Sequence, residues 1–275
     1  MHSYLIMFKS LSFAVIVLLS LPPAFAAPPR MDSLTISQSE AGLTLGCALD
    51  KLCVEIIPSQ ADCEGQACPS ILVDDADWSL RLSGGQHDPA HTPYGLSELS
   101  SADAEPSFQL WPTLIRFEGG ILAGVETQLR AMYSGGGASS TTLHLIAFLP
   151  GQPPFEVLSV PQSANVMIRA CFSERDMKHR AQVCHDEYNF DASLDLTEVS
   201  AAGMPVLRYR SEATSFPGPV SRFEDSLAGR PLSKSDIVTV TNPLCSYHRL
   251  YSFDPEARGY IPDTPPPDCS DYTVP

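Results

Sequence analysis

The densest set of chemically active side chains lies in residues 171–189, CFSERDMKHRAQVCHDEYN. His185, Asp186 and Glu187 follow one another at its exit, and imidazole and carboxylate groups are those that general acid–base catalysis uses. On a strand, however, His185 and Glu187 point to one side and Asp186 to the other, so the three converge only if the chain bends. They are the candidate catalytic residues of a hydrolase. The competing interpretation is a solvated strand end whose charges pair with one another.

The first part of the same segment has the pattern of a rigid binding loop. Cys171 and Cys184 bracket it, and a disulfide between them would restrict its conformations. Residues 173–181 predict one or two helical turns, with Ser173 as N-cap and opposite charges four residues apart. The side chains in this loop that we predict to contact a partner are Glu174, Arg175, Asp176, His179 and Arg180.

Two pieces of this segment, Cys-Phe-Ser-Glu-Arg-Asp (171–176) and Cys-His-Asp-Glu-Tyr (184–188), resemble stretches of uncharacterised exported proteins of proteobacteria. The resemblance covers this segment alone. It implies no activity, because none is established for those proteins.

Other common catalytic and binding patterns do not occur in the sequence. There is no G-x-S-x-G nucleophile elbow, no H-E-x-x-H or EF-hand loop, and no Gly-rich phosphate loop between a strand and a helix. We therefore predict no metal site and no cofactor. The 32 Asp and Glu against 17 Lys and Arg, a net charge of −15, disfavour nucleic acid as a partner and favour a basic protein surface.

The first 26 residues have the features of an export signal. Lys9 precedes an apolar run from Leu11 to Leu21, and Ala24-Phe25-Ala26 is a small-x-small cleavage site. The run is too short to span a bilayer of about 30 Å, and no later stretch is longer. We expect the signal to be removed, no transmembrane segment to remain, and the protein to reside in the periplasm or outside the cell.

The cysteines support an oxidising compartment. An even number behind an export signal is typical of disulfides, and the gaps between the first four do not fit the short C-x₂₋₄-C pairs of zinc sites. Local pairing is the simplest arrangement, although other pairings among the first four cysteines remain open. The predicted bonds are Cys47–Cys53, Cys63–Cys68, Cys171–Cys184 and Cys245–Cys269.

The elements that would position these residues are short strands separated by Pro, Gly, Ser and Asp. The clearest is residues 125–133, where apolar and polar side chains alternate as in a half-buried antiparallel strand. Residues 134–138, SGGGA, end it, and a second strand over 141–149 completes a hairpin whose loop needs positive φ. Further predicted strands cover 33–37, 43–47, 53–57, 79–82, 155–160, 166–172, 187–196, 206–210, 237–241 and 248–253.

Together these patterns predict an all-β protein, an antiparallel sandwich or barrel-like arrangement with long disulfide-stapled loops and little helix. The expected organisation is a signal peptide (1–26), a cysteine-rich β module (27–84), a linker or long loop (85–106) and a main β domain with a Pro-rich C-terminal tail (107–275). We expect a non-catalytic cell-envelope protein that binds an envelope or secreted partner through rigid loops. The alternatives are a periplasmic hydrolase whose site assembles only in the fold, and a structural interaction module.

Overall fold

The structure, a computed structural model, describes residues 28–39, 43–58, 78–84, 92–99, 107–199, 203–222, 224–225 and 227–275. The predicted signal peptide and the predicted Cys63–Cys68 bond lie outside these residues. Within them the fold is all-β and antiparallel, as the sequence predicts, with two sheets packed in a sandwich-like arrangement.

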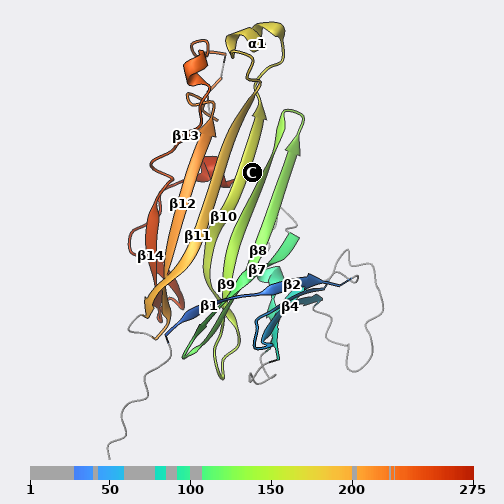
Figure 1. Ribbon diagram of the computed structural model, residues 1–275, viewed down its shortest axis with the longest axis vertical. Coiled ribbons are helices and arrows are strands. Elements are labelled where there is room, and N and C mark those ends of the chain that lie inside the picture. The colour runs from blue at the N-terminus through green and yellow to red at the C-terminus, as the bar shows by residue number, and fades with distance from the viewer. Residues whose placement is uncertain are drawn as a thin grey trace, which may run out of the picture.

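A ten-stranded sheet runs the length of the molecule (Figure 1). Its hydrogen-bonded order is β1-β7-β8-β9-β10-β11-β12-β14-β15, and β13 pairs with β12. Its strands are β1 (Arg30–Ser33), β7 (Ser107–Phe117), β8 (Gly120–Tyr133), β9 (Gly136–Phe148), β10 (Phe155–Arg169), β11 (His185–Val199), β12 (Pro205–Phe216), β13 (Val240–Thr241), β14 (His248–Asp254) and β15 (Gly259–Pro262).

A smaller five-stranded sheet covers one end of the first. Its order is β2 (Thr35–Gln38), β3 (Thr44–Cys47), β4 (Cys53–Pro58), β5 (Trp78–Ser83) and β6 (Tyr94–Gly95), and a 3₁₀ turn, η1 (Leu96–Leu99), follows β6. Leu52, Val54 and Leu80 from this side form one buried cluster with Leu114 and Ile146 from the long sheet. Apolar burial between the sheets is therefore what holds them together.

The N-terminal segments are distributed differently from the predicted organisation. Residues 30–33, expected in the cysteine-rich module, form β1 at the edge of the ten-stranded sheet, where they pair with β7. Residues 94–99, expected in the linker, form β6 and η1. The chain thus crosses from one sheet to the other directly after Ser33, and the Leu34 N–H donates to the carbonyl of Pro112 in β7.

The long sheet is buried on both faces where the two sheets overlap. On β9, Leu143, Leu145 and Ala147 pack in one core cluster, whereas the alternating Ile146 and Phe148 pack in the cluster shared with the five-stranded sheet. Farther along, β10 has a bulge between Pro161 and Ser163. A bulge adds twist and bends its strand. The Tyr209 hydroxyl on β12 then reaches across to donate to the Pro161 carbonyl at 2.7 Å.

Three of the predicted disulfides are confirmed. Cys47 and Cys53 lie directly opposite each other on β3 and β4, Cys171–Cys184 closes the connection between β10 and β11, and Cys245–Cys269 ties down the C-terminal tail. Beyond Cys269 a short helix, α2 (Ser270–Thr273), buries Tyr272 edge-on against Tyr188 of β11.

Several strand predictions need correction. Residues 155–160 and 166–172 belong to a single strand that ends at Arg169, and residues 237–241 form a strand only at Val240–Thr241, after a 3₁₀ turn, η2 (Lys234–Asp236). The turn between β8 and β9 is shorter than predicted, because Gly136 already lies in β9 with φ of 154°. Among the described residues no helix is long and apolar enough to cross a membrane.

Candidate functional site

The predicted binding loop lies at the end of the long sheet farthest from the five-stranded sheet (Figure 1). The last paired residues of β10 and β11 are Arg169 and His185, and the disulfide Cys171–Cys184 follows directly, with the two Cα atoms 4.8 Å apart. The loop it closes contains the six-residue helix α1 (Glu174–His179). A covalent link at the strand ends therefore holds the helix on a rigid sheet.

Asp176 fixes the start of α1 instead of facing a partner. Its side chain is buried and accepts from the Phe172 backbone N–H at 2.9 Å, while its own N–H donates to the Ser173 hydroxyl at 3.2 Å. The Phe172 N–H and the Ser173 hydroxyl lower the pKa of Asp176 because both stabilise the charged carboxylate. Ser173 is the N-cap that the sequence predicts.

Arg180 is the most buried charged side chain of the loop, with 1% of its surface exposed. Its guanidinium forms an ion pair with Asp186 and also donates to the Val183 carbonyl at 3.1 Å. Burial raises the pKa of Asp186, and the charge of Arg180 opposes that rise. Asp176 and Arg180, both predicted to contact a partner, therefore build the loop.

Of the other predicted contact residues, Glu174 and Arg175 lie on the outward side of the loop, whereas His179 is half-buried and its Nδ1 atom is enclosed. Phe172 is 69% exposed and Met177 39% exposed, and Arg175 and Lys178 are also exposed. Neither cation has a side-chain hydrogen bond or ion pair within the described part of the chain. The Arg169 guanidinium lies 4.9 Å from the centroid of the Phe172 ring and so supports its outward position.

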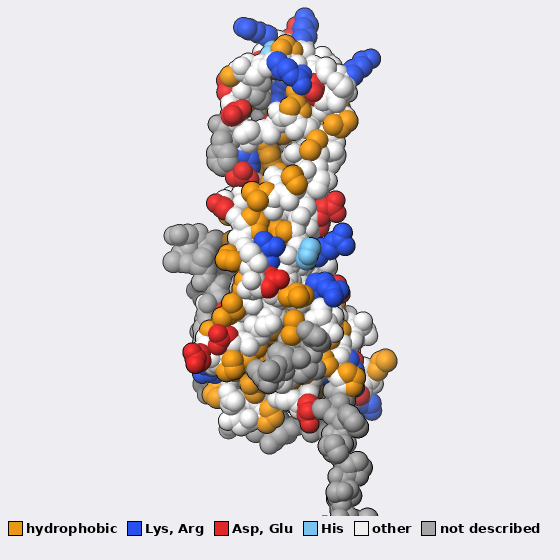
Figure 2. Space-filling model, turned by 90° about the vertical axis from the view of Figure 1, so that its left-hand side faces the viewer, with side chains coloured by type: hydrophobic (Ala, Val, Ile, Leu, Met, Phe, Trp, Pro, Cys, Tyr) orange, Lys and Arg blue, Asp and Glu red, His pale blue; other side chains and the backbone are white. Residues whose placement is uncertain are grey.

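A second segment, residues 227–236, lies beside α1, because the Leu232 N–H donates to the His179 carbonyl at 2.8 Å. We call residues 171–184 and 227–236 together the tip. The tip holds five Lys or Arg against three Asp or Glu, whereas the whole chain holds 17 against 32. Figure 2 shows Lys and Arg side chains gathered at this end among apolar ones. The tip is thus a cationic and apolar surface on an acidic protein.

The candidate catalytic residues at the exit of the loop do not assemble into one site. The His185 Nε2 and Glu187 Oε1 atoms are 2.8 Å apart on the exposed face of β11, and both side chains are more than one-third exposed. Asp186 points to the opposite face, where Arg180 holds it. The three described grooves, one beside Glu156, one along residues 37–39 and 43–45, and one at residues 252–263, include none of the three.

A different set of three polar side chains does come together, near the five-stranded sheet. The His144 Nδ1 lies 2.7 Å from Glu156 Oε1, and its Nε2 lies 3.0 Å from Thr127 Oγ1. The three come from adjacent strands, β8, β9 and β10, and His144 and Thr127 are buried at 7% and 6% exposure. Sequence reasoning did not single out these residues.

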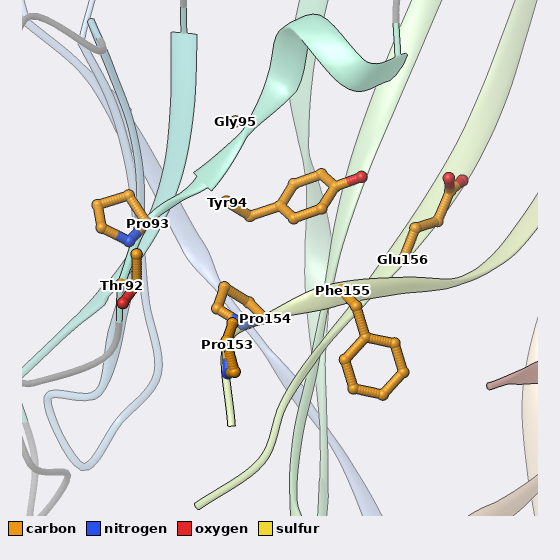
Figure 3. A pocket seen from close by; sticks show the side chains of 8 residues that line it. All are labelled: Thr92, Pro93, Tyr94, Gly95, Pro153, Pro154, Phe155 and Glu156. Atoms are coloured by element: carbon orange, nitrogen blue, oxygen red, sulfur yellow. The ribbon is translucent and has the colours of Figure 1, made fainter. Parts of the chain in front are cut away.

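The carboxylate fixes the direction of one of these hydrogen bonds. An ionised carboxylate only accepts, so Nδ1–H donates to Glu156. Toward Thr127, Nε2 accepts from the hydroxyl when the ring is neutral and donates to it when the ring is protonated. Glu156 faces a groove of about 410 Å³, lined also by Thr92, Pro93, Tyr94, Gly95, Pro153, Pro154 and Phe155 (Figure 3). The carboxylate is outermost and the hydroxyl innermost. Attack by Thr127 on a substrate would need the reverse order.

Comparison of the chain with protein-family models, curated proteins and solved structures finds no match.

Proposed function

We propose that this is an exported, non-catalytic binding protein that contacts another component of the cell envelope, or a secreted protein, through the tip. One observation carries the proposal: the inner polar groups of the disulfide-closed loop fix its shape, whereas Phe172 and Met177 are exposed and Arg175 and Lys178 have no side-chain hydrogen bond or ion pair in the described chain. A preorganised loop loses little conformational entropy when it binds.

The chemistry of the tip indicates the kind of surface it would meet. Exposed aromatic and Met side chains bury apolar area on contact, and the exposed Arg175 and Lys178, which have no ion pair in the described chain, favour an acidic counterpart. The net charge of the whole chain favours a basic partner, but the side chains that would touch the partner are those of the tip. We therefore propose a protein partner with an acidic, partly apolar face.

Export is supported by the disulfides together with the predicted signal sequence. Three bonds close loops within the described residues, and disulfides persist mainly in oxidising compartments. The periplasm or the extracellular space is therefore the proposed location.

A hydrolase is the weaker proposal. His185 and Glu187 form a solvent-exposed pair that lines none of the three described grooves, and Thr127 does not line the groove beside Glu156. Acid–base or nucleophilic catalysis requires groups that reach a common substrate position.

The test is capture of partners from envelope extract by the oxidised mature protein and by the variant Phe172→Ala/Arg175→Glu/Lys178→Glu. We expect specific partners to be captured by the wild type and lost with the variant. The matched control is Leu49→Ala/Lys51→Glu, which makes similar changes in the exposed loop closed by Cys47–Cys53 at the other end of the molecule. Equal capture by the wild type and the tip variant would refute the proposal.

A further inference from the structure

The groove beside Glu156 lies between two segments that are far apart in sequence. Residues 92–95, which lead into and form β6, make one wall, and residues 153–156, which lead into and begin β10, make the other (Figure 3). The Tyr94 ring is buried between them and extends toward Glu156. Proline and aromatic groups thus form most of the lining.

Glu156 is the one charged residue among the described residues that line this groove. Its side chain is 33% exposed, so it is neither withdrawn into the core nor free in solvent. The buried His144 holds its Oε1 atom from the interior, and Thr127 in turn holds His144. The carboxylate is therefore fixed in orientation before any ligand arrives.

A fixed carboxylate in a groove lined by prolines and aromatic rings matches a particular ligand chemistry. Lysine and arginine have a long apolar stem and a cationic head, and the stem packs on apolar surface while the head seeks an anion. Glu156 is the carboxylate of this groove, and no lysine or arginine of the chain is among the described lining residues. The Arg258 guanidinium lies 4.2 Å from the centroid of the Phe155 ring, and this contact stabilises the position of Phe155.

We propose that the groove binds a basic side chain, lysine or arginine, of a peptide or protein segment, with Glu156 as the counter-ion. His144 and Thr127 are positioning residues, which act through Glu156. This site lies at the opposite end of the molecule from the tip and does not depend on the function proposed for the tip.

The test is a titration of the oxidised full-length mature protein, followed by amide NMR, with N-acetyl-lysine methylamide and with its neutral counterpart N-acetyl-norleucine methylamide. We expect the lysine probe at millimolar concentrations to shift the amide signals of Tyr94, Gly95, Phe155 and Glu156, and the norleucine probe to leave them in place. Equal responses to the two probes, or no response to either, would overturn the proposal without any variant.

Variants test the assigned roles. Glu156→Gln keeps the shape and removes the charge, so lysine affinity should fall roughly tenfold or more. Thr127→Val leaves the carboxylate but loosens His144, and the preference for lysine over norleucine should fall about two- to fivefold. Glu174→Gln removes one charge at the tip and should change nothing. Unaltered lysine binding by a folded Glu156→Gln protein would exclude Glu156 as the counter-ion.

Discussion

In the loop closed by Cys171–Cys184, some charged side chains hold the loop together and others are exposed on its surface. Arg180, paired with Asp186, is of the first kind. The pair is buried beneath α1, where each ion is stable only because the other is present. Along the sequence, Arg180 and Arg175 look alike, yet one supports the loop and the other is displayed on it. Arg175 is exposed in the first turn of α1, whereas Arg180 directly follows the helix and its side chain is buried.

The buried ion pair predicts strongly non-additive stabilities. Arg180→Met alone leaves Asp186 buried without a counter-ion, and we expect it to lower the free energy of unfolding by about 3–5 kcal/mol. Arg180→Met combined with Asp186→Leu should cost much less than the sum of the two single changes. Urea unfolding of the two single variants, the double variant and the wild type measures these free energies. If the effect of the double change equalled the sum of the two single effects, the Arg180–Asp186 ion pair would be contradicted.

Replacement of Glu126 on β8 by glutamine should stabilise the protein in a pH-dependent way. Burial raises the pKa of Glu126 above its usual value of 4.5, so the folded protein holds this proton more tightly than the unfolded chain. The stabilisation by the protonated form is fully present below 4.5 and is lost as the pH rises through the raised pKa. Glu126→Gln stays neutral, so its melting temperature should exceed that of the wild type at neutral pH and match it in acid. The exposed Glu256→Gln is the control. If Glu126→Gln and the wild type melted at the same temperature at both pH values, a raised pKa of Glu126 would be contradicted.

The Thr127–His144–Glu156 chain could not have been predicted from the sequence. His144 is one polar residue in an apolar run, a pattern shared with many structural histidines. Its partners are 17 and 12 residues away, and their approach depends on the register of β8 and β10 against β9. Register cannot be read from one strand alone. In contrast, the separation of Asp186 from His185 and Glu187 follows from strand alternation.

At the scale of elements, the disulfides were the most predictable feature. Local spacing alone gives the three pairings that the described residues contain. The β8–β9 hairpin was also predictable from alternation and glycine. The strand β7 was not, because Pro112 interrupts its pattern, and the structure accommodates the proline at a register shift between Leu110 and Leu114.

The loop lengths predict an order of stabilisation by the disulfides. The paired cysteines are 6, 13 and 24 residues apart for Cys47–Cys53, Cys171–Cys184 and Cys245–Cys269. The loop-entropy relation gives contributions of roughly 2.4, 3.0 and 3.5 kcal/mol in that order. Replacing each pair in turn by serines and measuring chemical unfolding tests the order. If the Cys47–Cys53 replacement cost the most, native-state contacts rather than loop entropy would dominate.

Removal of the Cys171–Cys184 bond should also weaken binding at the tip without unfolding the sheet. The long sheet pairs β10 with β11 below this bond over seven residue pairs, so we expect the sheet to persist in the Cys171→Ser/Cys184→Ser variant. The released loop should exchange its amide hydrogens faster and capture less partner. Exchange in residues 171–184 that is unchanged from the wild type would show that the bond is not what holds α1.

For the whole molecule, the long sheet separates two surfaces of different charge character. The tip carries cationic and apolar groups, and the groove beside Glu156 at the other end carries an anion among prolines and aromatic rings. Composition predicted the acidic total but not this separation, because net charge contains no positional information. The all-β class was predictable from alternation and turn residues, whereas the pairing of β1 with β7 was not.

The most direct test of the tip as the binding surface is site-specific photo-crosslinking in producing cells. Benzoylphenylalanine would replace either Phe172 in the tip or Leu49, which is fully exposed on the loop closed by Cys47–Cys53. We predict a discrete crosslinked product from position 172 that is absent from position 49 and is lost when Arg175→Glu and Lys178→Glu are added. A product from position 49 with none from position 172 would contradict binding through the tip.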